Sequence, residues 1–237
     1  MSPTPSPSVI VFDVNETLSD LAPLAERFLA VGAPAHRAPL WFATVLRDGF
    51  ALSAVGDARP FAQLGAEALR TLLHDVDLWE DPAAGLDGSL ESAVEHVLDG
   101  MGRLPLHPDV VDGVRGLRAD GHRLFTLSNG SVRVGEQLLT AAGVREEFEA
   151  VLSVEDVGVW KPAPAAYEHV LRVSGARAEE SLLVAVHLWD VDGAARAGLG
   201  TAWIDRRGTP YPASFASPRV HARGLVDLRA RLAAGER

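Results

Sequence analysis

Polar side chains that can do chemistry follow several apolar segments of this sequence, at the points where buried strands would end. Asp13 comes directly after residues 9–12, which read Val-Ile-Val-Phe, and the hydroxyl of Thr17 stands four residues further along. In an open parallel sheet, ligands bind outside the carboxyl ends of the strands, so an Asp at that edge is placed to meet a small ligand. An Asp after a strand is also common turn chemistry. The residues at the other strand ends distinguish between these two interpretations.

Three further strand ends carry polar groups of complementary types. They are Ser128 and Asn129 after residues 122–127, Lys161 in the loop after residues 150–153, and His187 and Asp190 after residues 181–186. Taken singly, each has an ordinary structural role, such as a helix cap, a solvated lysine or a core histidine. In a parallel sheet, however, the carboxyl ends of the strands share one edge, and ligands bind there. The common edge favours a catalytic site that includes Asp13.

The order of the elements around these groups predicts an α/β fold. Apolar runs at 9–12, 122–127, 150–153, 181–186 and 201–204 alternate with helical spacing at 110–120, 132–142, 164–173, 193–198 and 225–234. Such alternation is typical of a doubly wound, Rossmann-like parallel sheet. Helical spacing without a strong strand pattern occurs at 20–31, 39–54, 61–74 and 90–101. We therefore expect a flexible tail at 1–8, a core formed by 9–18 and 105–237, and an all-helical cap, 19–104, inserted after the first strand.

The composition excludes several classes of protein and of site. The 237 residues include no cysteine, which excludes disulfides, thiolate catalysis and zinc–thiolate sites. A formal net charge of −10 argues against nucleic acid and anionic membranes as partners. No apolar run approaches the ~20 residues of a membrane span, and the first residues lack the pattern of a signal peptide. We expect a cytoplasmic protein that acts on a small molecule.

Four short motifs carry a resemblance to a known family. They are Phe12-Asp13-x-x-x-Thr17-Leu18, Leu127-Ser128-Asn129-Gly130-Ser131, Lys161-Pro162 and Trp189-Asp190-x-x-Gly193-Ala194. Together they resemble the haloacid dehalogenase superfamily and, within it, the L-2-haloacid dehalogenase (type II) group. The resemblance implies hydrolysis of short 2-haloalkanoic acids to 2-hydroxy acid and halide without a cofactor. It also implies that the protein can form a homodimer.

The resemblance implies a role for each group at the sheet edge. Asp13 is the expected nucleophile, which forms an ester with C2 of the substrate, and Lys161 is the cation that holds it ionised. Thr17 orients the carboxylate by a hydrogen bond. A water molecule then hydrolyses the ester, and either Asp190 or His187 is the base that takes its proton. The side chains expected to contact the substrate are Asn15, Phe42, Arg47, Ser128, Asn129, Tyr167 and Trp189.

The residue two positions after the expected nucleophile separates two reactions. The phosphatases of the superfamily carry a second Asp there as a general acid, and this sequence has Asn15. An amide cannot donate or accept that proton, so a phosphatase would lack its general acid here. Asp190 and Asp192 could still help to bind Mg²⁺. A magnesium-dependent phosphatase, or a weakly active protein that binds a small carboxylate, therefore stays as the alternative to a dehalogenase.

Three other positions depart from the dehalogenase pattern. The family has a halide-accepting arginine after Leu-Trp in the cap, whereas Leu40-Trp41 is followed here by Phe42. Arg37, Arg47 or an aromatic cradle of Phe42 and Trp41 could take its place. Ala185-Val186-His187 replaces the family's Ser-x-Asn, so one imidazole stands where a hydroxyl and an amide position the water. Glu16 stands where the family usually has Gly.

Overall fold

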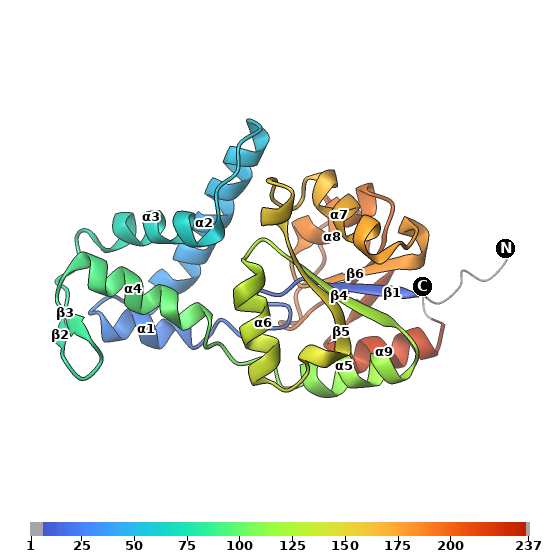
Figure 1. The fold of residues 1–237 in the computed structure, drawn as a ribbon, viewed down its shortest axis with the longest axis horizontal. Coiled ribbons are helices and arrows are strands. Elements are labelled where there is room, and N and C mark those ends of the chain that lie inside the picture. The colour runs from blue at the N-terminus through green and yellow to red at the C-terminus, as the bar shows by residue number, and fades with distance from the viewer. Residues whose placement is uncertain (1–6, 236–237) are drawn as a thin grey trace.

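The computed structural model describes residues 7–235, so most of the predicted tail at 1–8 lies outside the described residues. Within that range a parallel sheet of six strands has the order β5-β4-β1-β6-β7-β8 (Figure 1). The strands are β1 (Val9–Phe12), β4 (Arg123–Ser128), β5 (Phe148–Ser153), β6 (Ser181–Ala185), β7 (Gly200–Ile204) and β8 (Val220–Ala222). The predicted doubly wound α/β fold is confirmed. The edge strand β8 was not predicted.

Helices cover both faces of the sheet, which is why β1 reads as an uninterrupted apolar run. Ile10 and Phe12 belong to the apolar cluster on the α5 and α9 side, whereas Val9 and Val11 belong to the cluster that includes α7 and α8. The helices of the core are α5 (Val110–Ala119), α6 (Val132–Ala141), α7 (Pro164–Ser174), α8 (Leu188–Arg196) and α9 (Leu225–Ala233). Short 3-10 helices lie between these elements at η1 (Arg145–Glu147), η2 (Val154–Asp156) and η3 (Ala178–Glu180).

The segment between β1 and α5 forms a group of helices at one side of the sheet, on the left in Figure 1. The helices are α1 (Leu24–Ala30), α2 (Arg37–Ala54), α3 (Phe61–Leu73) and α4 (Leu90–Met101). The expectation that this segment is helical throughout is wrong in one place, because β2 (Glu80–Asp81) pairs with β3 (Leu86–Asp87) as an antiparallel hairpin. Strands of two residues are too short to show an alternating pattern. The domain boundaries at 19 and 105 stay a prediction.

Trp160, in the loop before α7, joins the cap helices to the core. Its ring stacks on Phe61 of α3, with centroids 5.9 Å apart and planes 13° from parallel, and its Nε1 donates to the Arg59 carbonyl at 3.0 Å. A Cβ placed on Gly49 of α2 would lie 2.4 Å from the Trp160 ring. Gly49 therefore lets α2 approach the indole closely.

We expect Trp160→Ala to lower the free energy of unfolding by about 3–5 kcal/mol, because it leaves a cavity between the cap helices and the core. Trp79→Ala is the matched control, since the Trp79 side chain is 59% exposed and its loss should cost less than about 0.5 kcal/mol. Urea unfolding of the two variants measures both values. Equal losses of unfolding free energy in the two variants would show that Trp160 does not hold the cap helices to the core.

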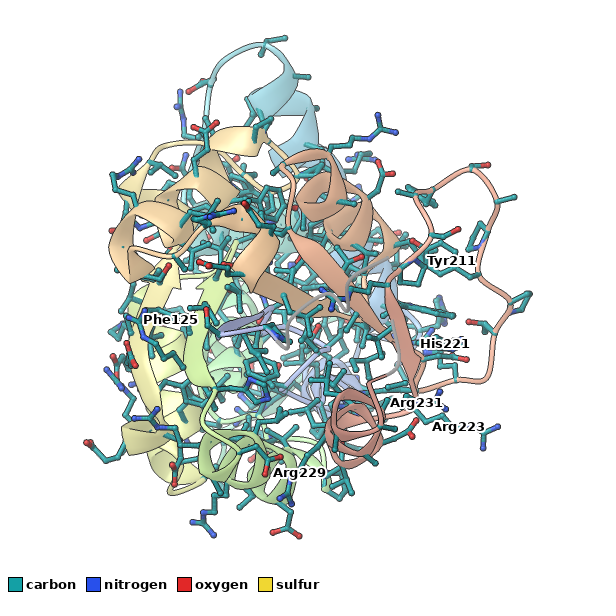
Figure 2. The ribbon with its side chains drawn as sticks, turned by 90° about the vertical axis from the view of Figure 1, so that its right-hand side faces the viewer. Phe125, Tyr211, His221, Arg223, Arg229 and Arg231 are labelled. Atoms are coloured by element: carbon teal, nitrogen blue, oxygen red, sulfur yellow. The ribbon has the colours of Figure 1, made fainter. Side chains whose placement is uncertain are left out.

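The β7–β8 edge of the sheet steadies the backbone next to the catalytic motifs. Tyr211, from the loop after β7, and His221, from β8, both lie at this edge (Figure 2). The Trp203 ring packs against both, with centroids 5.0 Å from Tyr211 and 4.5 Å from His221. Trp203 Nε1 donates to the Val186 carbonyl at 3.0 Å. This bond anchors the chain one residue before His187.

Candidate active site

The carboxylate of Asp13 lies just past the end of β1, where the strand ladder holds its backbone. The Asp13 amide donates to the Val184 carbonyl of β6 at 3.0 Å. The Thr17 hydroxyl donates to Asp13 Oδ2 at 2.7 Å and accepts from the Val186 amide at 3.1 Å. Thr17 therefore ties the Asp13 carboxylate to the end of β6. The side chain of Asp13 is buried, which keeps most water away from its carboxylate.

Lys161 is fully buried and its ammonium uses all three of its donors. It donates to Asp13 Oδ1 at 2.9 Å, to Asp190 Oδ2 at 2.6 Å and to the Leu127 carbonyl at 2.7 Å. Asn129 holds the Lys161 backbone, because its Oδ1 accepts from the Lys161 amide at 2.9 Å and its Nδ2 donates to the Lys161 carbonyl at 3.4 Å. The amide of Asn129 thus positions the lysine.

Asp190 lies in the first turn of α8 and is fully buried. The sequence placed this helix at 193–198, whereas the structure begins it at Leu188. Asp190 therefore lies inside the helix, where its Oδ2 accepts from Lys161 and its Oδ1 accepts from Tyr167 Oη at 2.7 Å. A Cβ on Gly193, one turn after Asp190 in α8, would lie 2.6 Å from Tyr167 Oη. Glycine at this position therefore leaves room for the phenol.

His187 bridges two carboxylates. Its Nδ1 lies 3.0 Å from Asp13 Oδ2, and its Nε2 lies 2.9 Å from Glu16 Oε2. The imidazole stacks on Phe42 of α2 (6.1 Å between centroids, 29°) and on Trp189 (4.9 Å, 22°). The expected site did not include Glu16, although its place at a usual glycine was a signal. Its φ of 61° is in the left-handed region that favours glycine.

The charges of the cluster support one another. Burial opposes ionisation of Asp13, but the charges of Lys161 and His187 and the hydrogen bonds of His187 and Thr17 outweigh it and hold the Asp13 pKa well below its usual range. Burial likewise opposes the charge of Lys161, yet Asp13 and Asp190 raise its pKa. At neutral pH the site therefore holds an ionised Asp13 beside a protonated lysine.

The two possible bases differ in their protonation. Burial alone would lower the pKa of His187, but its hydrogen bonds to Asp13 and Glu16 raise it to about 9. His187 therefore carries its proton at neutral pH while Asp13 is ionised. Burial raises the pKa of Asp190, and the nearby charge of Asp13 adds to this, although Lys161 and Tyr167 oppose the shift. A raised carboxyl pKa suits a group that takes a proton from water.

The other expected contact residues divide into two groups. Ser128 Oγ accepts from the Gly130 amide at 2.9 Å, and a Cβ on Gly130 would lie 3.6 Å from Asn15 Nδ2, so these polar groups lie together. Trp189 also lies beside the lysine, with Lys161 Nζ 5.9 Å from its ring centroid. The structure does not bring Arg47 to this cluster. Its side chain is 71% exposed and pairs with Asp48 at 2.8 Å.

The remaining halide candidates also have other partners. Trp41 is fully buried and its Nε1 donates to the Gly65 carbonyl at 2.9 Å, so it is part of the cap core. Arg37 pairs with Asp75 at 3.0 Å. Of the proposed acceptors, Phe42 alone contacts the cluster, through His187.

A cleft of about 1120 Å³ opens beside this cluster, between the cap helices α1 and α2 and the loop after β7. Glu16, His187, Trp189 and Phe42 are among its lining residues. The aromatic rings make one wall apolar, and the Glu16–His187 pair lies between this space and Asp13. A small ligand that enters here meets the imidazole.

Among residues 7–235, no three or more His, Cys, Asp or Glu side chains are arranged to hold a metal ion. The space between Asp13 and Asp190 is filled by the ammonium of Lys161. Asp192 faces elsewhere, since it pairs with Arg196 at 2.7 Å and accepts from the Ala216 amide at 2.8 Å. Within the same described range, no helix has the length and apolar character to cross a membrane.

Comparisons with known proteins agree on one family. The model of the haloacid dehalogenase-like hydrolases matches residues 7–198. (S)-2-haloacid dehalogenase 1 of Pseudomonas sp. (strain CBS-3) is 28% identical over 220 residues, which cover 92% of this chain and 93% of that protein. Haloacetate dehalogenase H-2 of Moraxella sp. (strain B) is 31% identical over 204 residues, 85% of this chain and 87% of that protein. The solved L-2-haloacid dehalogenase RSc1362 is 28% identical, with a TM-score of 0.86 over 97% of this chain and 100% of that one.

Proposed function

This chain belongs to the haloacid dehalogenase-like hydrolases, and from that membership we propose that it hydrolyses short 2-haloalkanoic acids to 2-hydroxy acids and halide. The observation that carries the proposal is the buried, ionised Asp13, which Lys161, Thr17 and His187 hold by hydrogen bonds. Relatives named as 2-haloacid and haloacetate dehalogenases, similar over most of their length, support the same reaction. No cofactor is needed for either step.

In the first step, Asp13 attacks C2 of the substrate as the carbon–halogen bond breaks. A C–O bond forms, the halide leaves with the bonding electrons, and the carbon centre is inverted. Lys161 keeps the carboxylate ionised and aimed, and the buried site strips water from it. We assign binding of the substrate carboxylate to the Ser128 hydroxyl, which follows β4, and to the amides at the start of α6, because helix N-termini bind anions. The product of this step is an ester on Asp13.

In the second step, water attacks the carbonyl carbon of that ester, and Asp190 accepts a proton from the water. The bond between the Asp13 carbonyl carbon and the substrate oxygen then breaks. The departing oxygen takes up the proton, and the 2-hydroxy acid leaves. Asp13 keeps an oxygen atom from the water and releases the other proton as it ionises. This order predicts that the carboxyl oxygen of Asp13 exchanges with solvent during turnover.

The alternative of a magnesium-dependent phosphatase has less support in this geometry. Asn15 stands in place of the general acid, and the ammonium of Lys161 lies between the two carboxylates. Asp192, the other acidic candidate, pairs with Arg196. A cytoplasmic location and a homodimer remain predictions from the sequence.

The test compares two reactions of the purified protein. We expect halide release from 2-chloropropionate or bromoacetate in the presence of a chelator. We expect no comparable release of phosphate from p-nitrophenyl phosphate with Mg²⁺. Phosphate release that needs Mg²⁺, without halide release, would refute the dehalogenase proposal.

We also expect Phe42→Ala to lower kcat/KM for halide release by roughly 10-fold or more, because the ring covers His187 and shields the leaving halide from water. Arg47→Ala should change kcat/KM less than about twofold, since its guanidinium points outward and pairs with Asp48. Steady-state halide assays on both variants check this. The reverse order of effects would assign halide binding to Arg47.

A further inference from the structure

We propose that His187 and Glu16 act together in hydrolysis of the Asp13 ester, with the His187 imidazolium as the donor that stabilises the oxyanion. Glu16 is the positioning residue that keeps the imidazole charged. The inference rests on the proposed function, because it concerns the second step of that reaction. In this proposal His187 keeps its proton and donates a hydrogen bond, whereas a base would accept a proton from water.

The hydrogen bonds to Asp13 distinguish its two oxygens. Oδ2 accepts from the Thr17 hydroxyl at 2.7 Å and faces His187 Nδ1 at 3.0 Å. Oδ1 accepts from Lys161 at 2.9 Å. Oδ1 has fewer donors directed at it, so its lone pairs are the freer to attack carbon. Once Oδ1 carries the substrate, Oδ2 is the carbonyl oxygen of the ester, with Thr17 and His187 already in place.

Formation of the ester removes the negative charge of Asp13. A buried imidazolium that loses its only counter-ion tends to release its proton. Glu16 prevents this, because its Oε2 lies 2.9 Å from Nε2, on the other side of the ring from Asp13. His187 therefore still holds its proton when water attacks and charge develops on Oδ2. A charged donor aimed at that oxygen lowers the barrier.

The surroundings of His187 leave few other charges that could set its protonation. Phe42 from α2 and Trp189 from α8 cover its two faces with uncharged rings. Asp13 and Glu16 are the acidic groups that contact it, and Lys161 lies beyond Asp13. Arg207 lies beyond Glu16, with Nη2 3.7 Å from Oε1. Within this apolar sandwich, the two carboxylates control the charge of the imidazole.

The backbone of Glu16 is consistent with this role. Residues other than glycine rarely adopt a φ of 61°, and such strain persists where the surroundings require it. The His107 Nε2 lies 3.0 Å from the Glu16 carbonyl, which fixes the same turn. The turn directs the carboxylate of Glu16 back toward His187.

The protons balance without a change at His187. Water gives one proton to Asp190 as the oxyanion forms on Oδ2, where the Thr17 hydroxyl and His187 Nδ1–H both donate to it. The tetrahedral centre then collapses, the bond from the carbonyl carbon to Oδ1 breaks, and Oδ1 leaves with the hydroxy acid after it takes the proton from Asp190. The second proton of the water remains on the new Asp13 carboxyl group and is released to solvent as that group ionises. His187 ends the cycle protonated and paired again with the ionised Asp13.

The experiment measures ester formation and ester decay separately, with 2-chloropropionate as the probe. A rapid-quench time course gives the halide burst, and intact-protein mass gives the adduct on Asp13 and its decay between pH 6 and 10. In the unchanged protein we expect the decay rate to fall as the pH rises, once the imidazolium loses its proton. The fall should lie below the pKa of about 9 that His187 has in the resting site, because the ester has removed the charge of Asp13 and leaves Glu16 to hold the proton. In Glu16→Gln the fall should begin at least about one pH unit lower still, because the ester of this variant lacks both carboxylates that raise the pKa.

Controls separate this inference from the function on which it rests. Glu95→Gln, an exposed site on α4, should keep the unchanged pH profile. His187→Ala should slow ester decay by roughly 10²-fold, as loss of an oxyanion donor does, while the halide burst remains. The ester of His187→Gln, which keeps a neutral donor, should decay faster than that of His187→Ala, and its decay rate should lose the fall at alkaline pH. A halide burst in both variants also shows that they are folded.

Three outcomes would contradict the proposals in distinguishable ways. A decay rate that rises with pH through the same range would make His187 a base and overturn the inference. A Glu16→Gln profile identical to that of the unchanged protein would remove Glu16 from the reaction. The absence of any halide burst in the unchanged protein would instead refute the proposed function itself.

Discussion

Replacing Asp13 by Asn lowers the rate of halide release by roughly 10⁴-fold or more, the expected effect of removing a covalent nucleophile. The amide cannot form the ester, and it also leaves the charges of Lys161 and His187 without the anion that both contact. Asp190, the other carboxylate that Lys161 contacts, does not take over, because its two oxygens already accept from Lys161 and Tyr167.

Two measurements check this prediction. Halide assays compare Asp13→Asn with Asp77→Asn, an exposed site in the cap segment that should retain full activity. A single turnover of the unchanged protein in ¹⁸O-labelled water should place the label on Asp13 and not on the first hydroxy acid released. Substantial halide release by Asp13→Asn, or label in the first product, would refute the ester mechanism.

Replacing Lys161 by Met should lower the free energy of unfolding by about 3–5 kcal/mol at neutral pH, and it should abolish activity. The ammonium is fully buried and bridges Asp13 and Asp190. Its removal leaves two buried carboxylates without their shared cation, which is the costly way to break a buried ion pair. Urea unfolding at pH 8 measures the loss relative to the unchanged protein.

The loss should depend on pH in a definite direction. Without the cation, nothing of its charge opposes the effect of burial, which raises the pKa of Asp190, and Asp13 loses one of the charges that lower its pKa. The folded variant therefore binds protons that the unfolded chain has released. Its stability relative to the unchanged protein should therefore be lower at pH 8 than at pH 5. The unchanged protein has less of this deficit, because the charge of Lys161 opposes the effect of burial on the Asp190 pKa and the Asp13 pKa lies well below its usual range.

A double variant provides the control for this prediction. Lys161→Met combined with Asp190→Asn removes one of the two buried carboxylates that have lost their shared cation and should recover part of the lost stability. An equal loss at pH 5 and pH 8, with no recovery in the double variant, would show that the lysine stabilises the fold through its packing and not through its charge.

The sequence predicted the architecture because the long apolar strands and the amphipathic helices have strong periodic patterns. β1 illustrates this, since both of its faces are buried and every residue is apolar. The missed elements lack such patterns. β8 has three residues, one of them the exposed His221, and the β2–β3 hairpin consists mostly of exposed Glu and Asp. Short edge strands form where neighbouring structure offers a partner, which the local sequence does not report.

The site shows a similar division. The positions of Asp13, Lys161 and Asp190 follow from motifs at strand ends, because parallel topology brings those ends to one edge. Arg47 is close to Phe42 in sequence, but the two side chains point in different directions. Five residues along an α-helix rotate a side chain by about 140°. Glu16 was missed because its effect depends on a left-handed backbone that directs it to His187. A contact made by a rare backbone conformation leaves only a weak signal in the residue type.

The burial of Lys161 has a practical consequence, because it is the only lysine in the sequence and arginine supplies the other basic side chains. An amine-directed label therefore has a single side chain with which to react, and that amine is sealed inside the folded protein. Its rate of modification reports how often the catalytic centre opens to solvent. The natural Lys161 amine thus reports local opening of this site without any substitution.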